Sequence, residues 1–180
     1  MGKSMKSKLL LFTLLAMGQL FSVSVWASQE ENKLLAVFLG RFASYIEFPE
    51  RTAGQFVITV IDENPFGNLL DDLYRGKAIG GKPVVIRYAT KIEEIGQGDI
   101  LFITLVNPRN RQEAIDYGIK NSILTISTAA GFAERGGIIQ LDFLQQHTRL
   151  KINHGSAVKS NIRIGAPLLS LATVIRGDAP

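Results

Sequence analysis

The chain has 180 residues, with 20 Lys and Arg against 16 Asp and Glu, and it contains no Cys. The lack of Cys excludes disulfide bonds and redox control through the chain's own thiols. Residues 1–27 hold three of the basic residues and none of the acidic ones, which leaves 17 basic against 16 acidic residues in the rest. This near balance gives no electrostatic footprint for nucleic acid or for an anionic membrane surface, so we expect neither as a partner.

The first 27 residues have the layout of a secretory signal peptide. Three lysines form a basic start, an apolar run over 9–25 follows, and small residues precede a predicted cut after Ala27. An uncleaved membrane anchor is the alternative, but a span needs about 20 apolar residues and the uninterrupted core of this run is shorter. The sequence therefore predicts an exported chain whose mature part, residues 28–180, forms a single domain.

Apolar residues at helical spacing begin the mature chain, and a six-residue β-branched run, Phe56–Ile61, comes next. Such a run is typical of a strand buried on both faces in a parallel sheet. Asn64 and Pro65 are residue types preferred at the cap and at the first position of a helix. In chain order we expect a helix over 30–47 that ends before Pro49, a strand over 56–61, a helix from Pro65 to about Gly76, a strand over 83–88 and a short helix or turn over 92–95.

Strands and helices continue to alternate in the second half, which indicates βαβ units. A compact turn over 131–137, where Gly137 is a candidate for a positive φ, then precedes a hairpin. We predict an α/β fold: a Rossmann-like three-layer sandwich with a mostly parallel sheet and a C-terminal antiparallel hairpin at one edge. The expected elements are a strand over 100–105, a helix over 108–117 closed by Gly118, a strand over 122–127, hairpin strands over 138–143 and 150–153, an extended stretch through Ile162 and Ile164, and a final helix from Pro167 to Ile175.

The sequence offers little material for catalysis or for binding a metal or cofactor. Its two histidines, His147 and His154, lack metal-ligand spacing, and no G-x-S-x-G, G-x-G-x-x-G or Walker motif is present. We therefore expect no catalytic residues, no metal, no cofactor and no enzymatic activity. The alternative is an uncharacterised hydrolase, which requires Ser127, Asp62 and His154 to converge within hydrogen-bond reach.

Polar residues follow several predicted strands at their carboxyl ends. In open parallel sheets small ligands bind at that edge, where the strand order reverses. One hypothesis is therefore a periplasmic sensor that binds a small molecule in a pocket at this edge. The alternative is that these side chains only cap helices and turns. The candidate ligand pocket consists of Asp62, Glu63, Asn64, Thr104, Asn107 and Ser127.

The first predicted helix is apolar on nearly all sides. A helix that packs on one sheet face buries only a stripe, so part of this surface is expected to face a partner protein or, in a homodimer, a second copy of the chain. The alternative is a helix wedged between other elements and buried on most sides. The candidate partner interface consists of Leu35, Leu39, Phe42 and Ile46.

A series of short motifs lies along the mature chain, and their order and spacing are informative together, although no single motif is diagnostic. In the order and spacing of these motifs, the chain resembles the YfiR family of exported bacterial proteins. The motifs are residues 36–39 with Phe42, 45–49, 58–61 leading to 64–67, 76–77 with 81–85, 99–103, 123–127, 131–133 with 136–139, 150–153 and 168–172.

The resemblance implies a periplasmic α/β domain that regulates by binding another protein. It implies repression of a membrane-bound diguanylate cyclase through the periplasmic domain of that enzyme, which lowers cyclic di-GMP and biofilm formation. Related domains also look like input modules of sensor kinases, so the periplasmic domain of a sensor kinase is a second partner class. The family has no agreed catalytic residues to transfer, and the paired cysteines of some relatives are absent here.

Overall fold

The computed structural model describes residues 29–51, 54–144 and 147–176. The chain divides into two compact units, Met1–Leu35 and Ala36–Pro180. In the first unit, residues 29–35 are described and are helical. The predicted signal peptide, residues 1–27, lies outside the described residues. Over the described ranges, no helix combines the length and the apolar character needed to cross a membrane.

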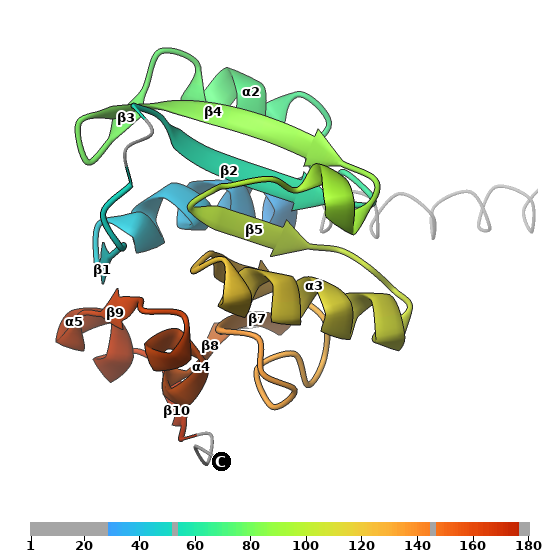
Figure 1. Cartoon of the computed structure of the whole chain (residues 1–180), viewed down its shortest axis with the longest axis vertical. Coiled ribbons are helices and arrows are strands. Elements are labelled where there is room, and N and C mark those ends of the chain that lie inside the picture. The colour runs from blue at the N-terminus through green and yellow to red at the C-terminus, as the bar shows by residue number, and fades with distance from the viewer. Residues whose placement is uncertain (1–28, 52–53, 145–146, 177–180) are drawn as a thin grey trace, which may run out of the picture. The chain divides into compact units, whose positions relative to one another are not determined.

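An eight-stranded, mostly parallel sheet forms the centre of the second unit. Neighbouring strands are parallel except for the antiparallel pairs β7–β8 and β3–β4. The arrows of β2, β4 and β5 point the same way in Figure 1. The strand order is β10 (Thr173–Ile175), β8 (His147–Asn153), β7 (Ile139–Leu144), β6 (Leu124–Ser127), β5 (Ile100–Ile103), β2 (Phe56–Ile61), β4 (Lys82–Ala89) and β3 (Ala78–Ile79). A separate two-stranded antiparallel sheet joins β1 (Ile46–Glu47) to β9 (Arg163–Ile164).

Apolar layers cover both faces of the sheet, because successive side chains of a strand point to opposite faces. All six residues of β2 are buried. On one face, Phe102 of β5 packs against Phe66, with ring centroids 5.3 Å apart. On the other face, Leu101 and Ile103 share a buried cluster with Ile115 of α3. This explains why the central strands read as continuous apolar runs rather than as alternating ones.

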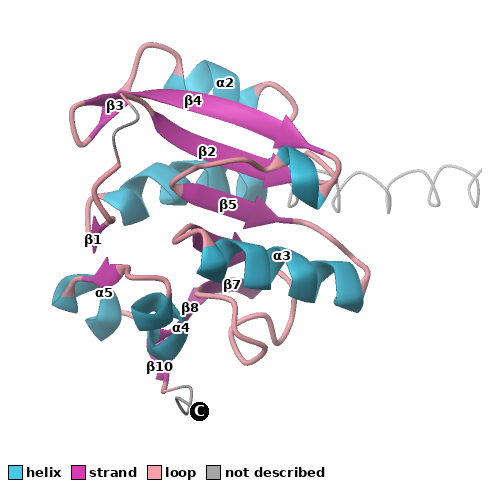
Figure 2. Ribbon diagram, in the orientation of Figure 1, coloured by secondary structure: helices cyan, strands magenta, loops and turns pink. Residues whose placement is uncertain are grey.

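Helices flank the sheet on both sides, which confirms the predicted three-layer α/β fold. The first helix covers residues 29–43, and its part in the second unit, residues 36–43, lies beside α2 (Leu69–Tyr74), because the Tyr74 hydroxyl bonds to the backbone of residues 36 and 40. The 3₁₀ helix η1 (Ile92–Glu94) and α3 (Pro108–Lys120) pack together on the opposite face. Figure 2 shows α4 (His154–Lys159) and α5 (Ala166–Ser170) near β9 and β10.

The predicted hairpin is confirmed as β7 and β8, and a further strand adds to it. β10 pairs in parallel with β8, so β10 is the outermost strand on that side. The prediction of one helix from Pro167 to Ile175 is wrong: α5 ends at Ser170, and residues 173–175 form β10. The apolar residues of this segment are compatible with either a helix or a strand. The segment becomes a strand because it pairs with the edge of β8.

Three helix boundaries also differ from the sequence prediction. The first helix ends at Ala43 rather than at residue 47, because Ile46 leaves it to pair with Ile164 in the small sheet. Residues 65–68 form turns, and helix α2 begins only at Leu69. Gly118 lies inside α3 rather than after it. A Cβ atom at Gly118 would overlap the Thr125 side chain, so glycine permits close packing of α3 on β6.

Candidate functional site

The strand ends bring the six residues of the candidate ligand pocket to one edge of the sheet, where two hydroxyls serve local structure. The Thr104 hydroxyl donates to the carbonyl of Ile61 at 2.6 Å or to that of Glu63 at 2.9 Å. The Ser127 hydroxyl donates to the Ile103 carbonyl at 2.6 Å and accepts from the Ala129 amide at 3.1 Å. These bonds satisfy backbone groups at the carboxyl ends of β2, β5 and β6.

The two asparagines of the candidate pocket cap turns and helices. The Asn107 side chain accepts from the amides of Arg109 and Asn110, which makes it the N-cap of α3. The Asn64 carboxamide accepts from the Phe66 amide at 3.0 Å and donates to the Gly67 carbonyl at 2.9 Å. Both arrangements satisfy backbone groups that helix and turn starts leave unpaired.

The remaining two members, Asp62 and Glu63, are exposed carboxylates. Asp62 has a positive φ of 78°, a conformation that Asp tolerates better than most residues. Four of the six predicted side chains are therefore engaged in local hydrogen bonds. Binding of a ligand at this edge stays a prediction, and the carboxylates are the groups left to meet it.

A small cavity does open beside this edge, but it is lined by other residues. It has a volume of about 210 Å³ and lies among the residues that follow β2, β4 and β5 and the first turns of α3. Ile61 and Leu105 form its apolar wall, and Lys91, Glu93 and Glu113 provide charged groups. This volume is below the range of about 300–1,000 Å³ that is usual for ligand pockets.

The side chains that the sequence predicts as a partner interface on the first helix are buried in the structure. Leu35, Leu39, Phe42 and Ile46 are all at most 8% exposed. Their side chains are therefore buried within the chain itself. Val37, 40% exposed, and Tyr45, 48% exposed just after the helix, are its accessible apolar side chains in the second unit. A partner interface formed by Leu35, Leu39, Phe42 and Ile46 stays a prediction.

A groove with a volume of about 330 Å³ runs between the first helix, α2 and β3. We call it the α2 groove. Burial raises the pKa of the Tyr74 hydroxyl in its floor, and the hydrogen bond from the Gly40 amide opposes this increase. The walls of the α2 groove include Val37, Arg41, Leu73, Lys77, Ala78 and Ile79.

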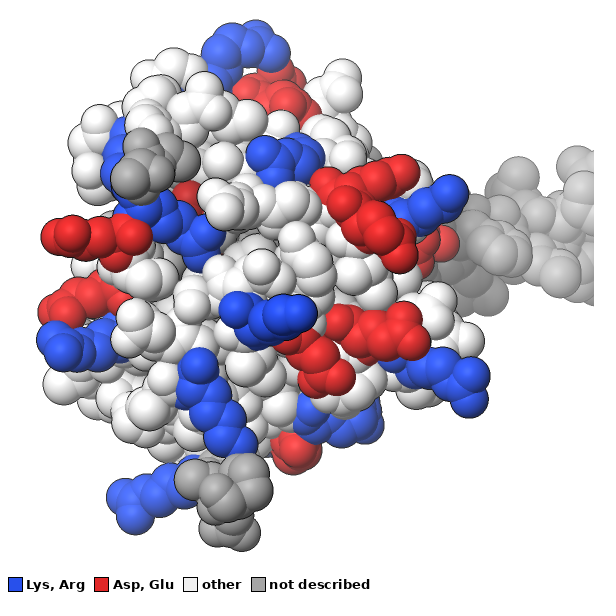
Figure 3. Space-filling view, in the orientation of Figure 1, with Lys and Arg blue, Asp and Glu red and all other residues white. Residues whose placement is uncertain are grey.

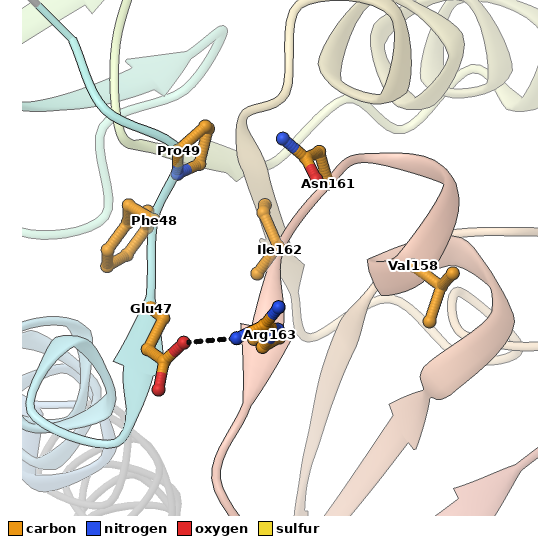
Figure 4. Close-up of a pocket in the computed structure, with 7 residues that line it drawn as sticks. All are labelled: Glu47, Phe48, Pro49, Val158, Asn161, Ile162 and Arg163. Carbon is orange, nitrogen blue, oxygen red and sulfur yellow. Dashed lines mark hydrogen bonds and ion pairs between the residues drawn. The ribbon is translucent and has the colours of Figure 1, made fainter.

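A second cleft of about 320 Å³ is lined by residues 47–49, which begin in β1, by Val158 of α4 and by residues 161–163, which lead into β9 (Figure 4). Phe48, Pro49 and Ile162 supply apolar lining, and two further lining residues, Glu47 and Arg163, form an ion pair of 3.2 Å. Both charged side chains are largely exposed, so the pair contributes little to stability.

The surface charge is mixed, in agreement with the near-neutral composition. Figure 3 shows acidic and basic side chains interspersed on the face drawn. In the part of the chain that the structure describes, no cluster of three or more His, Asp and Glu side chains is placed to hold a metal ion.

Burial and the hydrogen bond to Asp71 raise the pKa of the Tyr88 hydroxyl.

The comparisons with known proteins identify the family. A crystal structure of a conserved domain protein from Vibrio cholerae O1 biovar eltor superposes with a TM-score of 0.53 at 16% identity, which shows a shared fold alone. The alignment covers 79% of this chain, and the chain spans 59% of the length of that structure. No curated protein matches the chain. The YfiR/HmsC-like family matches residues 32–173, and the chain therefore belongs to the YfiR/HmsC-like family.

Proposed function

We propose that the chain is a periplasmic regulator that binds the periplasmic domain of a membrane-bound signalling enzyme and represses it. The enzyme is a diguanylate cyclase in this proposal, so the output is a lower level of cyclic di-GMP and less biofilm. The observation that carries the proposal is the family match over residues 32–173, which spans the whole sheet up to the start of β10.

Deletion of the gene tests the proposal, with cyclic di-GMP measured by mass spectrometry. The deletion strain is expected to contain more cyclic di-GMP than the parent strain, and expression of the full chain should restore the parental level. An unchanged level in a strain that expresses a membrane diguanylate cyclase would contradict the proposal.

Export is part of the same proposal and has its own control. A chain without residues 2–27 should remain in the cytoplasm and fail to complement the deletion, because the proposed partner domain lies in the periplasm. The intact mass of the protein from the periplasmic fraction should correspond to a start at Ser28. A full-length protein that requires detergent for extraction would support the membrane anchor instead.

A further inference from the structure

The α2 groove presents apolar side chains to solvent on a rigid frame. Val37 from the first helix, Leu73 from α2 and Ile79 from β3 line it. Val37 is 40% exposed, and Leu73 and Ile79 are half-buried. The frame is rigid because the Tyr74 hydroxyl joins α2 to the first helix by two hydrogen bonds of 2.7 Å. Exposed apolar area held in a fixed groove is characteristic of a surface that binds another molecule.

Two cationic side chains line the groove together with these apolar ones, and neither is paired with an acidic side chain among the described residues. Arg41 and Lys77 line the groove, and no carboxylate does. Neither residue forms an ion pair with any other residue in the described ranges. The neighbouring acidic side chains of α2 are used elsewhere: Asp72 pairs with Arg75, and Asp71 accepts the Tyr88 hydroxyl. The groove therefore combines an apolar floor with a net positive rim.

We propose that the α2 groove docks an apolar segment of a partner protein that carries at least one carboxylate side chain. The charge complementarity selects the carboxylate: an Asp or Glu opposite Arg41 and Lys77 gains two charge-assisted contacts at the rim. The apolar side chains of the segment cover Val37, Leu73 and Ile79. This inference rests on the proposed function only for the identity of the partner as a membrane signalling enzyme.

The test places a photo-crosslinking residue, benzoylphenylalanine, at position 37 of the full chain in its own cells. A control chain carries it at position 106, because Val106 is 74% exposed and lies outside the groove. We expect an adduct with a partner protein at position 37 and none at position 106. Peptide mass spectrometry should place the adduct in a segment that contains apolar residues and an Asp or Glu.

Charge reversal separates specific docking from unspecific capture. Arg41→Glu with Lys77→Glu should reduce the adduct about tenfold, because like charges then face the carboxylate. Reversal of the partner's carboxylate to Lys should restore the adduct with this variant. Arg109→Glu with Lys120→Glu changes two exposed cations of α3 and makes the same change in net charge, so it should leave the adduct unchanged. Circular dichroism of each variant confirms folding.

Several results would overturn the inference. These are the absence of an adduct at position 37, an adduct with lipid or with a second copy of the chain, and an adduct that charge reversal does not reduce. The proposed function fails separately. If deletion leaves cyclic di-GMP unchanged but the charge-dependent adduct forms with another protein, docking in the α2 groove is supported and repression of a diguanylate cyclase is contradicted. If the Arg41→Glu, Lys77→Glu chain complements the deletion fully, the cyclase proposal stands and the groove does not.

Discussion

The Tyr74 hydroxyl accepts a hydrogen bond from the Gly40 amide at 2.7 Å, and it donates to the Ala36 carbonyl at the same distance. In a regular α-helix the amide of residue 40 donates directly to the carbonyl of residue 36. A side chain of α2 is thus inserted at a turn of the first helix. The insertion is possible because residue 40 is glycine: a Cβ atom there would lie 2.8 Å from Tyr74 Cε1 and closer still to the hydroxyl.

Gly40→Ala is expected to lower the free energy of unfolding by about 1–3 kcal/mol, the usual cost of overpacking a well-packed site. The result is informative because alanine favours a helix over glycine by about 1 kcal/mol, so helix propensity alone predicts the opposite sign. Urea denaturation measures the difference.

The control is the same substitution in a Tyr74→Ala background. There the added methyl group meets no ring, so Gly40→Ala should be neutral or stabilising, and the two substitutions should show a coupling energy. Equal stability of Gly40→Ala and the parent chain would contradict the insertion of Tyr74.

A buried ion pair ties the segment after β1 to the central strands. Arg51 and Asp99 are 15% and 7% exposed in their side chains, with Arg51 Nε 3.7 Å from Asp99 Oδ1. Arg51 also donates to the carbonyls of Asn121 and Ser122, and the Asp99 carboxylate accepts from the Val57 amide. These contacts connect Arg51 to the turn after α3, and Asp99 to β2.

Arg51→Met should therefore lower the free energy of unfolding by about 3 kcal/mol, because it leaves a buried carboxylate without its cation. Arg109→Met removes an exposed cation from the start of α3 and should change stability by less than about 0.5 kcal/mol. Chemical denaturation of both variants measures the two values. If the two variants lost similar amounts of unfolding free energy, the ion pair of Arg51 with Asp99 would contribute no more to stability than an exposed cation does.

The turn before β7 illustrates what the sequence could predict there and what it could not. The glycine pair does mark a turn, but the positive φ of 99° belongs to Gly136 and not to Gly137. Gly137 is constrained by packing, since a Cβ atom there would overlap the ring of Phe132. Sequence alone shows where backbone freedom is needed, but it does not show which ring approaches the backbone.

Gly137→Val should destabilise the protein by about 1–3 kcal/mol through this overlap rather than through backbone strain. Thermal unfolding measures it. In a Phe132→Ala background the same substitution should cost less, because the ring that it meets is gone, although Phe132→Ala itself opens a cavity in the buried cluster. An equal cost in both backgrounds would assign the effect to the backbone.

The central strands were predictable because their signal is local. β2 and β5 are short, largely apolar runs in which every residue is buried, as is typical of strands in a parallel sheet. The two-residue strands β1 and β9 have no local signal, since they exist only through the pairing of Ile46 with Ile164 across the chain. The same dependence on a distant partner explains why the local pattern predicts helix for residues 173–175, which form β10 by pairing with β8.

The candidate sites depended even more on tertiary contacts. The strand ends were placed correctly, but only the structure shows that Thr104 and Ser127 donate to neighbouring carbonyls. On the first helix, apolar residues occur on nearly every side, so periodicity could not decide which stripe is covered. The contacts of Tyr74 with residues 36 and 40 place α2 beside this part of the helix, where Leu39 is buried and Val37 stays exposed.

The ion pair between Glu134 and Lys151 predicts a specific dependence of stability on pH. Lys151 Nζ lies 2.8 Å from Glu134 Oε1 and 3.8 Å from Asp142 Oδ2. The hydrogen bond from Lys151 lowers the pKa of Glu134, and the hydrogen bond to Glu134 raises the pKa of Lys151. The Glu134 contribution is therefore present above the unfolded pKa of about 4.3 and is lost as the pH falls through the lower folded pKa.

For Lys151 the sign is the reverse. Its contribution is present below the unfolded pKa of about 10.4 and is lost as the pH rises through the higher folded pKa, so the pair stabilises between the two limits. Glu134→Gln should lower the melting temperature at about pH 7, and the difference from the parent chain should shrink toward zero at about pH 3. Glu93→Gln changes an exposed carboxylate with no ion pair among the described residues and should show no such trend. A difference for Glu134→Gln that is the same at both pH values would mean that Glu134 stabilises the fold through packing and not through its charge.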